Sequence, residues 1–235
     1  MTEAEHAKLR TLLPAAAVHC FTALGVVCAL MALRAALAED WQELFVWLGI
    51  ALIIDGFDGT LARLTKIGTV LPRFSGERLD LIIDYLTYVF VPALALLFGG
   101  FLDGSFGVLL VALILLSSLF HFSDTESKTP DYCFVGFPAL WNVVAFYAFA
   151  LGLPSWLAAL VVIGLIVLTF VPWKWAHPMR TPLLRPVTLL VLAAWFGAAA
   201  LTVWNGFPAT PALQGVLIFA AAYMFGLVLF RSLAR

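Results

Sequence analysis

Residues 41–63 read WQELFVWLGIALIIDGFDGTLAR, and residues 79–100 read LDLIIDYLTYVFVPALALLFGG. Each stretch is long enough to cross the hydrocarbon core of a bilayer, which takes roughly 20 mostly apolar residues in a helix. Each also carries two aspartates at helical spacing, Asp55 with Asp58 and Asp80 with Asp84. Ionisable side chains are rare inside membrane segments, and there they mark functional sites. These two stretches therefore predict both the fold class and the place where its chemistry occurs.

The whole chain has the same apolar character. Of its 235 residues, 63% are hydrophobic and 11% are charged, whereas a soluble domain carries about a quarter charged residues. We therefore predict an all-α, polytopic membrane helix bundle that forms a single domain over residues 1–235. The expected membrane segments are eight: 12–36, 41–63, 79–100, 105–123, 135–152, 155–173, 186–204 and 211–230. Residues 152–155 leave two interpretations open for the fifth and sixth segments, a tight hairpin or one long broken helix.

Basic residues gather on one side of this predicted bundle. Arg34 alone falls near the opposite face, which collects Glu39, Asp40, Glu43 and Asp103. The positive-inside rule then places both termini in the cytoplasm. The basic residues on the cytoplasmic side are Lys8, Arg10, Arg63, Lys66, Arg73, Arg78, Lys128, Lys174, Arg180, Arg185, Arg231 and Arg235.

The four aspartates are expected to bind metal. Asp55 and Asp58 share one helix face, as do Asp80 and Asp84, and a short loop makes the two helices antiparallel neighbours. Buried carboxylates repel one another and are costly at membrane depth unless they are protonated, paired with arginine or lysine, or bound to a cation. Four of them on adjacent helices favour a hard divalent cation, Mg²⁺ or Mn²⁺. Two such ions would balance the four charges and suit an in-line phosphoryl displacement.

Small residues and an arginine accompany the acids. Gly56 and Gly59 each destabilise a helix by roughly 1 kcal/mol relative to alanine. Close helix packing is one explanation, and a bulky ligand lying against the helix is the other. For Gly56 both stay open, whereas the ligand is favoured for Gly59, which adjoins Asp58. Arg63 is interpreted either as an interfacial side chain or as a phosphate ligand.

Together these residues resemble the CDP-alcohol phosphotransferase family. Its signature, D-x2-D-G-x2-A-R followed by G-x3-D-x3-D, is matched by Asp55, Asp58, Gly59, Ala62, Arg63, Gly76, Asp80 and Asp84. The spacer of residues 64–75 is longer than in many members and is similar to that of the bacterial phosphatidylcholine synthase branch. AVHCFTALG, VLPRFSGERLDLIIDYLTYV, KTPDYCFVGFPALWN and HPMRTPLLRP also resemble that branch, so the likeness spans most of the chain.

The resemblance implies a reaction and its residues. CDP-diacylglycerol and choline would give phosphatidylcholine and CMP at the cytoplasmic face of a bacterial inner membrane. Asp55, Asp58, Asp80 and Asp84 would hold two Mn²⁺ or Mg²⁺ ions, and Asp84 would be the general base. The residues implied in binding the CDP group are Gly59, Ala62, Arg63, Gly76, Thr22 and His19. Members of the family are commonly dimers, so a homodimer is also expected. No nucleic-acid partner is expected.

Aromatic side chains are the natural partners of choline, a quaternary cation with no N–H to donate. The candidates also include one acid, and they lie just after the last aspartate of the signature or around the start of the fifth segment. For any single one of them, packing in the bundle is the competing explanation, and the same holds for His19 and Thr22 as helix-to-helix contacts. The candidates are Tyr85, Tyr88, Asp131, Tyr132, Phe137 and Trp141, with Phe134 nearby.

Two other functions compete with this one. A sibling enzyme would use serine, inositol or glycerol phosphate, but such anionic acceptors call for more cations than Lys128 in the fourth connection. An ion transporter would place its acids near the bilayer midplane, often with internal repeats.

Basic residues in the loop that holds His177, Arg180 and Arg185 either set topology or bind an anionic lipid headgroup.

Overall fold

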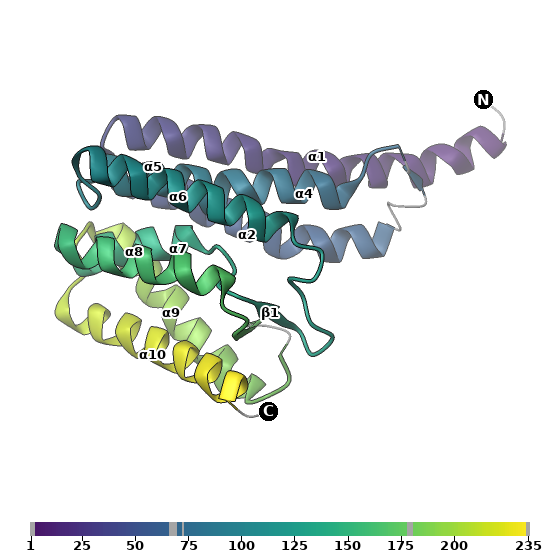
Figure 1. The fold of residues 1–235 in the computed structure, drawn as a ribbon. Helices are drawn as coiled ribbons and strands as arrows, with labels where there is room; N and C mark the ends of the chain where they lie inside the picture. Colours follow the sequence, from purple (N-terminus) through teal and green to yellow (C-terminus); the bar gives the residue numbers. More distant parts are fainter. Residues whose placement is uncertain (1–2, 66–69, 72, 178–180, 234–235) are drawn as a thin grey trace. The chain divides into compact units, whose positions relative to one another are not determined.

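The computed structural model describes residues 3–65, 70–71, 73–177 and 181–233 (Figure 1). The chain divides into two compact units, the first ending at Thr87 and the second beginning at Tyr88. Among the described residues, six helical stretches are long and apolar enough to cross a membrane. The chain is therefore an all-α, multi-pass membrane protein. Lys66, Arg180 and Arg235, three of the predicted cytoplasmic cations, lie outside the described residues.

The first unit is built from α1 (Glu3–Leu37), α2 (Trp41–Thr65) and α4 (Gly76–Asp84). Helix α1 packs against both α2 and α4 (Figure 1). Small buried side chains such as Ala29, Ala32 and Ala36 allow close approach along α1. Gly25 allows a close approach to α4, since an added Cβ would lie 2.4 Å from Ile83 Cγ2. Gly25 thus brings α4, with its two aspartates, against α1.

The third predicted segment is one apolar stretch made of three pieces. Helix α4 continues into a π-helical turn, η1 (Tyr85–Phe90), and then into α5 (Val91–Phe98). Pro92 has no N–H to donate and would clash with the carbonyl one turn earlier in a regular α-helix, so a change of register relieves it. The buried Thr87 hydroxyl donates to the Ile83 carbonyl at 3.0 Å across this junction. The helix therefore changes geometry immediately after Asp84.

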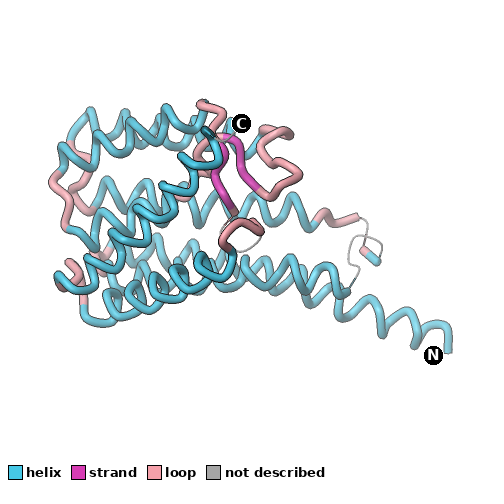
Figure 2. Tube along the Cα trace, turned by 90° about the horizontal axis from the view of Figure 1, so that it is seen from below, coloured by secondary structure: helices cyan, strands magenta, loops and turns pink. Residues whose placement is uncertain are grey.

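The second unit holds the remaining helices and a small sheet. Its helices are α5, α6 (Gly104–Ser123), α7 (Trp141–Leu151), α8 (Ser155–Phe170), α9 (Arg185–Asn205) and α10 (Pro211–Leu233). Strands β1 (Cys133–Val135) and β2 (Lys174–Ala176) pair antiparallel, with Phe134 opposite Trp175. They are the magenta segments of Figure 2. Helix α10 packs against α9 and against β2.

The fifth and sixth segments depart from the prediction. Residues 135–140 were expected to be helical, but they form the end of β1 and a loop, and α7 begins only at Trp141. Gly136 has φ +80°, and a Cβ there would lie 2.1 Å from the Thr169 carbonyl oxygen, so this residue must be glycine. Pro138 and Pro172 disfavour helix in the residues before them. A left-handed Gly152 separates α7 from α8, which excludes one long helix.

Candidate active site

Three of the four predicted acidic ligands come together in the first unit. Asp55 lies on α2, and Asp80 and Asp84 lie one turn apart on α4. One carboxylate oxygen from each of them lies within 4.8 Å of the other two. All three residues are half-buried. We call these three residues the acidic triad.

The cap of α4 sets where its two aspartates lie. Ser75 has extended backbone, and its hydroxyl accepts a hydrogen bond at 3.2 Å from the backbone N–H of Arg78. This cap satisfies one of the free N–H groups at the helix start and begins the helix at Gly76. From there, Asp80 and Asp84 fall on one helix face. Asp84 is the last residue of regular α-helix before the π-helical turn.

Asp58 is the fourth predicted ligand, and it lies outside the acidic triad. It is on the same helix as Asp55, three residues later, and it is 7% exposed. The site as described therefore has three carboxylates that lie close together. A fourth, Asp58, is buried three residues after Asp55.

The donor set of the acidic triad suits a hard divalent cation. Three carboxylates at this separation repel one another, and a cation between them relieves that repulsion. Mg²⁺ binds oxygen ligands at about 2.1 Å in octahedral geometry, so two oxygens on opposite sides of one ion are about 4.2 Å apart. Oxygens within 4.8 Å of one another need only a small movement to reach such an ion. The ion would neutralise charge that develops on a transferring phosphate group.

Arg63 lies back along α2 toward the acids. Its Nη2 donates to Thr60 Oγ1 at 3.0 Å, and a Cβ on Gly59 would lie 3.5 Å from its Nη1. The guanidinium therefore covers Gly59 and stays exposed. An added Cβ on Gly56 would meet no described atom within 4 Å. Close packing within the described structure therefore does not explain Gly56.

His19 brings an unsatisfied nitrogen to the start of α4. A Cβ on Gly76 would lie 3.4 Å from His19 Cε1, and the imidazole meets the Phe74 ring edge-on with centroids 6.5 Å apart. His19 Nε2 is buried and has no hydrogen-bond partner among the described atoms. Thr22, the next candidate along α1, is 7% exposed. A buried polar atom with no partner is costly unless a ligand or water satisfies it.

Ala62 has a packing role that the signature does not express. It packs, together with Leu61, against the buried pair Ala15 and Val18 of α1. A larger side chain at residue 62 would push α2 away from α1. Its small size therefore serves the helix interface in this structure.

The candidate choline residues of the second unit belong to a packed aromatic cluster. Phe137 meets Trp141 and Trp175 edge-on, with ring centroids 5.2 and 5.3 Å away. Trp141 is fully buried, and its Nε1 donates to Ser118 Oγ at 2.8 Å. Tyr132 differs, because its side chain is exposed while its carbonyl accepts from Thr181 Oγ1 at 3.0 Å. Tyr85, which follows Asp84, is half-buried, and Tyr88 is buried.

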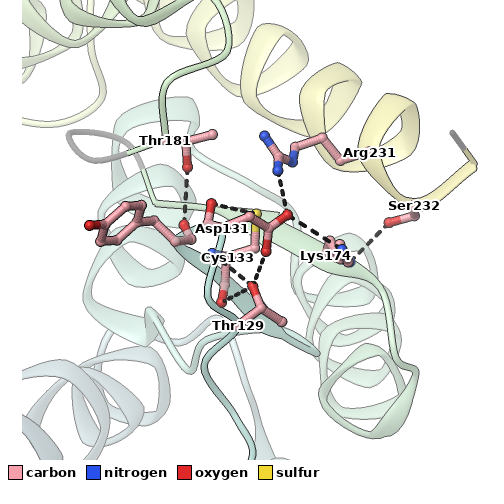
Figure 3. A network of polar contacts seen from close by, with 8 residues as sticks. Thr129, Asp131, Cys133, Lys174, Thr181, Arg231 and Ser232 are labelled. Carbon is pink, nitrogen blue, oxygen red and sulfur yellow. Dashed lines mark hydrogen bonds and ion pairs between the residues drawn. The ribbon is translucent and has the colours of Figure 1, made fainter. Parts of the chain in front are cut away.

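Asp131 is the centre of a polar network (Figure 3). Its carboxylate accepts hydrogen bonds from Thr129 Oγ1, Arg231 Nη2 and, at 3.4 Å, Lys174 Nζ. The Thr129 hydroxyl bond and the two cations hold the pKa of the Asp131 carboxyl far below its ordinary value. Burial raises the pKa of the neighbouring Cys133 thiol. The charge of Asp131 is therefore already compensated within the second unit.

Sequence reasoning missed several partners in this network and at the site. Arg231 and Asp131 are 100 residues apart, and no local pattern connects them. The same is true of Ser232, whose hydroxyl accepts from the Lys174 backbone N–H at 3.0 Å. Gly25 carried a signal, since glycine in a membrane helix often marks close helix approach. Phe74 carried none.

Comparison with known proteins gives a family and named relatives. Residues 16–127 match the model of the family described as CDP-alcohol phosphatidyltransferase. A phosphatidylcholine synthase of Pseudomonas aeruginosa is 43% identical over 92% of this chain and 90% of its own length. Proteins of the same name from Bradyrhizobium diazoefficiens and Rhizobium johnstonii are 44% and 37% identical, over 83% and 93% of this chain and 73% and 92% of theirs.

The family match contains α2 and α4 and therefore all three residues of the acidic triad. The similarity to the named phosphatidylcholine synthases covers nearly the whole chain. The protein therefore belongs to the CDP-alcohol phosphatidyltransferase family of enzymes.

Proposed function

We propose that this enzyme is a phosphatidylcholine synthase that joins choline to the phosphatidyl group of CDP-diacylglycerol. The choline oxygen would form a bond to the phosphorus that carries diacylglycerol, and the bond from that phosphorus to the CMP oxygen would break. The acidic triad is the observation that carries this proposal, because its oxygens lie within 4.8 Å of one another. The names of the relatives support choline as the acceptor.

Asp55, Asp58, Asp80 and Asp84 are the proposed ligands of two divalent ions, Mn²⁺ or Mg²⁺. Asp58 is included because it follows Asp55 at helical spacing and is buried. Asp84 would also accept the proton of the choline hydroxyl as the new bond forms. Its position at the end of α4, on the side where the helix geometry changes, is consistent with a group that must face substrate.

The CDP group is proposed to contact Gly59, Ala62, Arg63, Gly76, Thr22 and His19. The exposed Arg63 guanidinium over Gly59 supports a phosphate contact, since planar guanidinium groups bind phosphate oxygens through two donors. The unpartnered His19 Nε2 supports a hydrogen bond to the nucleotide. Ala62 would also set the separation of α1 and α2.

Choline recognition by Tyr85, Tyr88, Asp131, Tyr132, Phe137 and Trp141 stays a prediction. The exposed Tyr132 ring offers a face to a quaternary ammonium group. Asp131 already has two cationic partners, and the Trp141 side chain is enclosed. We therefore expect Tyr132 to contribute more than Asp131 or Trp141.

The full topology is also proposed. A helix occurs in each of the eight expected segments, although α7 and α8 are shorter than the six long apolar stretches. With the positive-inside rule, this supports eight crossings, both termini in the cytoplasm and an active site that faces the cytoplasm of a bacterial inner membrane. The family match runs across the boundary at Thr87, which supports one functional domain over residues 1–235. A homodimer stays a prediction.

A CMP-release assay tests this proposal. Purified enzyme in detergent is given CDP-diacylglycerol with Mn²⁺ or Mg²⁺ and one alcohol at a time: choline, serine, inositol or glycerol phosphate. We expect CMP and phosphatidylcholine only with choline and only with a divalent ion. Release with another alcohol instead would move the enzyme to that sibling activity, and no release with any alcohol would reject the proposal.

A further inference from the structure

A pocket lies in the second unit, where β2 meets the end of α10. Its volume is about 670 Å³. One wall is polar and comes from both elements, and the other is apolar and comes mainly from the residues between α8 and β2. The polar wall is Lys174, Arg231 and Ser232, and the apolar wall includes Val171, Pro172 and Trp173. We call this the β2–α10 pocket.

The β2–α10 pocket carries excess positive charge. Lys174 and Arg231 both pair with the single carboxylate of Asp131, so two cations share one acid and one positive charge remains. The Arg231 side chain is only 15% exposed. A guanidinium has five N–H donors, and Asp131 is the one acceptor of Arg231 among the described residues. Figure 3 shows Arg231 and Lys174 both reaching the Asp131 carboxylate. Spare donors on a largely buried cation favour an anionic ligand.

The position and the walls of the pocket suit a lipid. It lies where α8 has ended and in the last turn of α10, and both helices are strongly apolar. Basic residues at the ends of membrane helices attract anionic lipid headgroups, and tryptophan favours the same interfacial depth. Trp173 and Pro172 would provide apolar surface for the glycerol and upper acyl groups of a bound lipid, and Lys174 and Arg231 would contact its phosphate. A zwitterionic headgroup would bring an ammonium group toward Lys174 and Arg231.

We propose that the β2–α10 pocket binds a phosphate group, carried by an anionic phospholipid of the membrane. This site shares no described residue with the acidic triad, and the proposal does not depend on the proposed reaction. Free phosphate offers the same charge and acceptors, so the experiment must separate the two sources.

Native mass spectrometry of the delipidated protein in detergent tests the proposal, with CDP-diacylglycerol and choline left out. The protein is titrated with phosphatidylglycerol, with phosphatidylcholine, and with phosphatidylglycerol in the presence of inorganic phosphate. The variant is Lys174→Gln, which removes one pocket cation and keeps the Arg231–Asp131 pair. The matched control is Lys128→Gln, the same charge change at an exposed residue that does not line the pocket.

We expect phosphatidylglycerol to bind more tightly than phosphatidylcholine, and Lys174→Gln to weaken that binding about tenfold through the loss of one charge-assisted contact. Lys128→Gln should bind as the wild type does. Competition by millimolar phosphate would support the phosphate site with free phosphate as a ligand, and no competition would support the lipid. Equal binding of both lipids, or equal weakening by both variants, would overturn the proposal.

Discussion

Asp84 combines two proposed roles that make different demands on one carboxylate. As a metal ligand it belongs to the acidic triad, and as a general base it must also reach the acceptor hydroxyl. It sits at the junction of α4 and the π-helical turn, and such turns occur often at functional sites because they re-aim neighbouring side chains. Asp80, one turn earlier inside regular helix, has only the first role. Substitutions at the two residues should therefore differ.

Asp84→Asn should reduce the rate of CMP release about 10²- to 10⁴-fold, the range expected when a general base is lost. Asp103→Asn makes the same chemical change at the start of α6, outside the triad, and should leave the rate within about twofold. Steady-state kinetics of both purified variants provides the comparison. An Asp84→Asn enzyme with wild-type kcat would remove Asp84 from the mechanism.

Asp131→Asn should lower the free energy of unfolding by about 1 kcal/mol, because Arg231 would lose its charged partner while the 39% exposure of Asp131 limits the loss. For a chain of this length, that corresponds to a melting temperature about 2–4 °C lower. Thermal unfolding in detergent measures it.

The loss of stability caused by Asp131→Asn has a defined pH dependence. The pKa of Asp131 is lowered in the folded protein from an ordinary value of 3.8, so its stabilising contribution is complete above pH 3.8 and is lost only as the pH falls further. The difference between wild type and Asp131→Asn should thus be the same at pH 5 and pH 8. A difference that vanished between these values would contradict the ion-pair network.

At the scale of the elements, the separation of α1 and α4 depends on Gly25. Gly25→Ala should destabilise the protein by about 1–3 kcal/mol, because its Cβ would lie 2.4 Å from Ile83 Cγ2. Gly49→Ala on α2 is the control, since a Cβ there meets no described atom within 4 Å, and it should be neutral or slightly stabilising. Melting temperatures compare them. If Gly25→Ala cost as much stability in an Ile83→Ala background as it does in the wild type, the contact would not be the cause.

Apolar length predicted the helices well, and it failed where hydrogen bonding between distant segments decided the structure. Residues 135–140 are as apolar as a membrane segment, yet β1 pairs with β2, about forty residues later. Only the glycine and proline at 136 and 138 hinted at this. The π-helical turn was also not predictable, because a proline in a membrane helix can equally produce a simple kink.

The candidate site, too, was predicted where spacing along the chain decides the geometry and missed where packing decides it. Spacing within one helix correctly predicted that Asp80 and Asp84 share a face, and the short connection predicted that Asp55 would meet them. Helical spacing could not predict that Asp58 stays outside the triad, because the choice among side-chain conformations depends on packing around α2. The partner of Asp131 likewise depended on the tertiary fold, which places Arg231 beside it.

At the scale of the whole molecule, the proposed topology places both ends of the chain on the cytoplasmic side of the membrane. A green fluorescent protein fused after residue 235 should fluoresce, since it would remain in the cytoplasm. An alkaline phosphatase fused at Glu39, in the turn between α1 and α2 beside the Arg34–Glu43 pair, should be active because it would be exported. Whole-cell fluorescence and phosphatase activity provide the readouts. The reverse pattern at either fusion would contradict the predicted orientation.

The central claim is that the acidic triad holds a divalent cation, and a manganese titration tests it most directly. Free Mn²⁺ is followed by electron paramagnetic resonance as purified protein is added without substrates, for the wild type, Asp80→Asn and Asp103→Asn. We predict that Asp80→Asn weakens Mn²⁺ binding at least about tenfold, since one of three carboxylate ligands is lost, and that Asp103→Asn binds as the wild type does. Equal Mn²⁺ affinity of the wild type and Asp80→Asn would contradict the account.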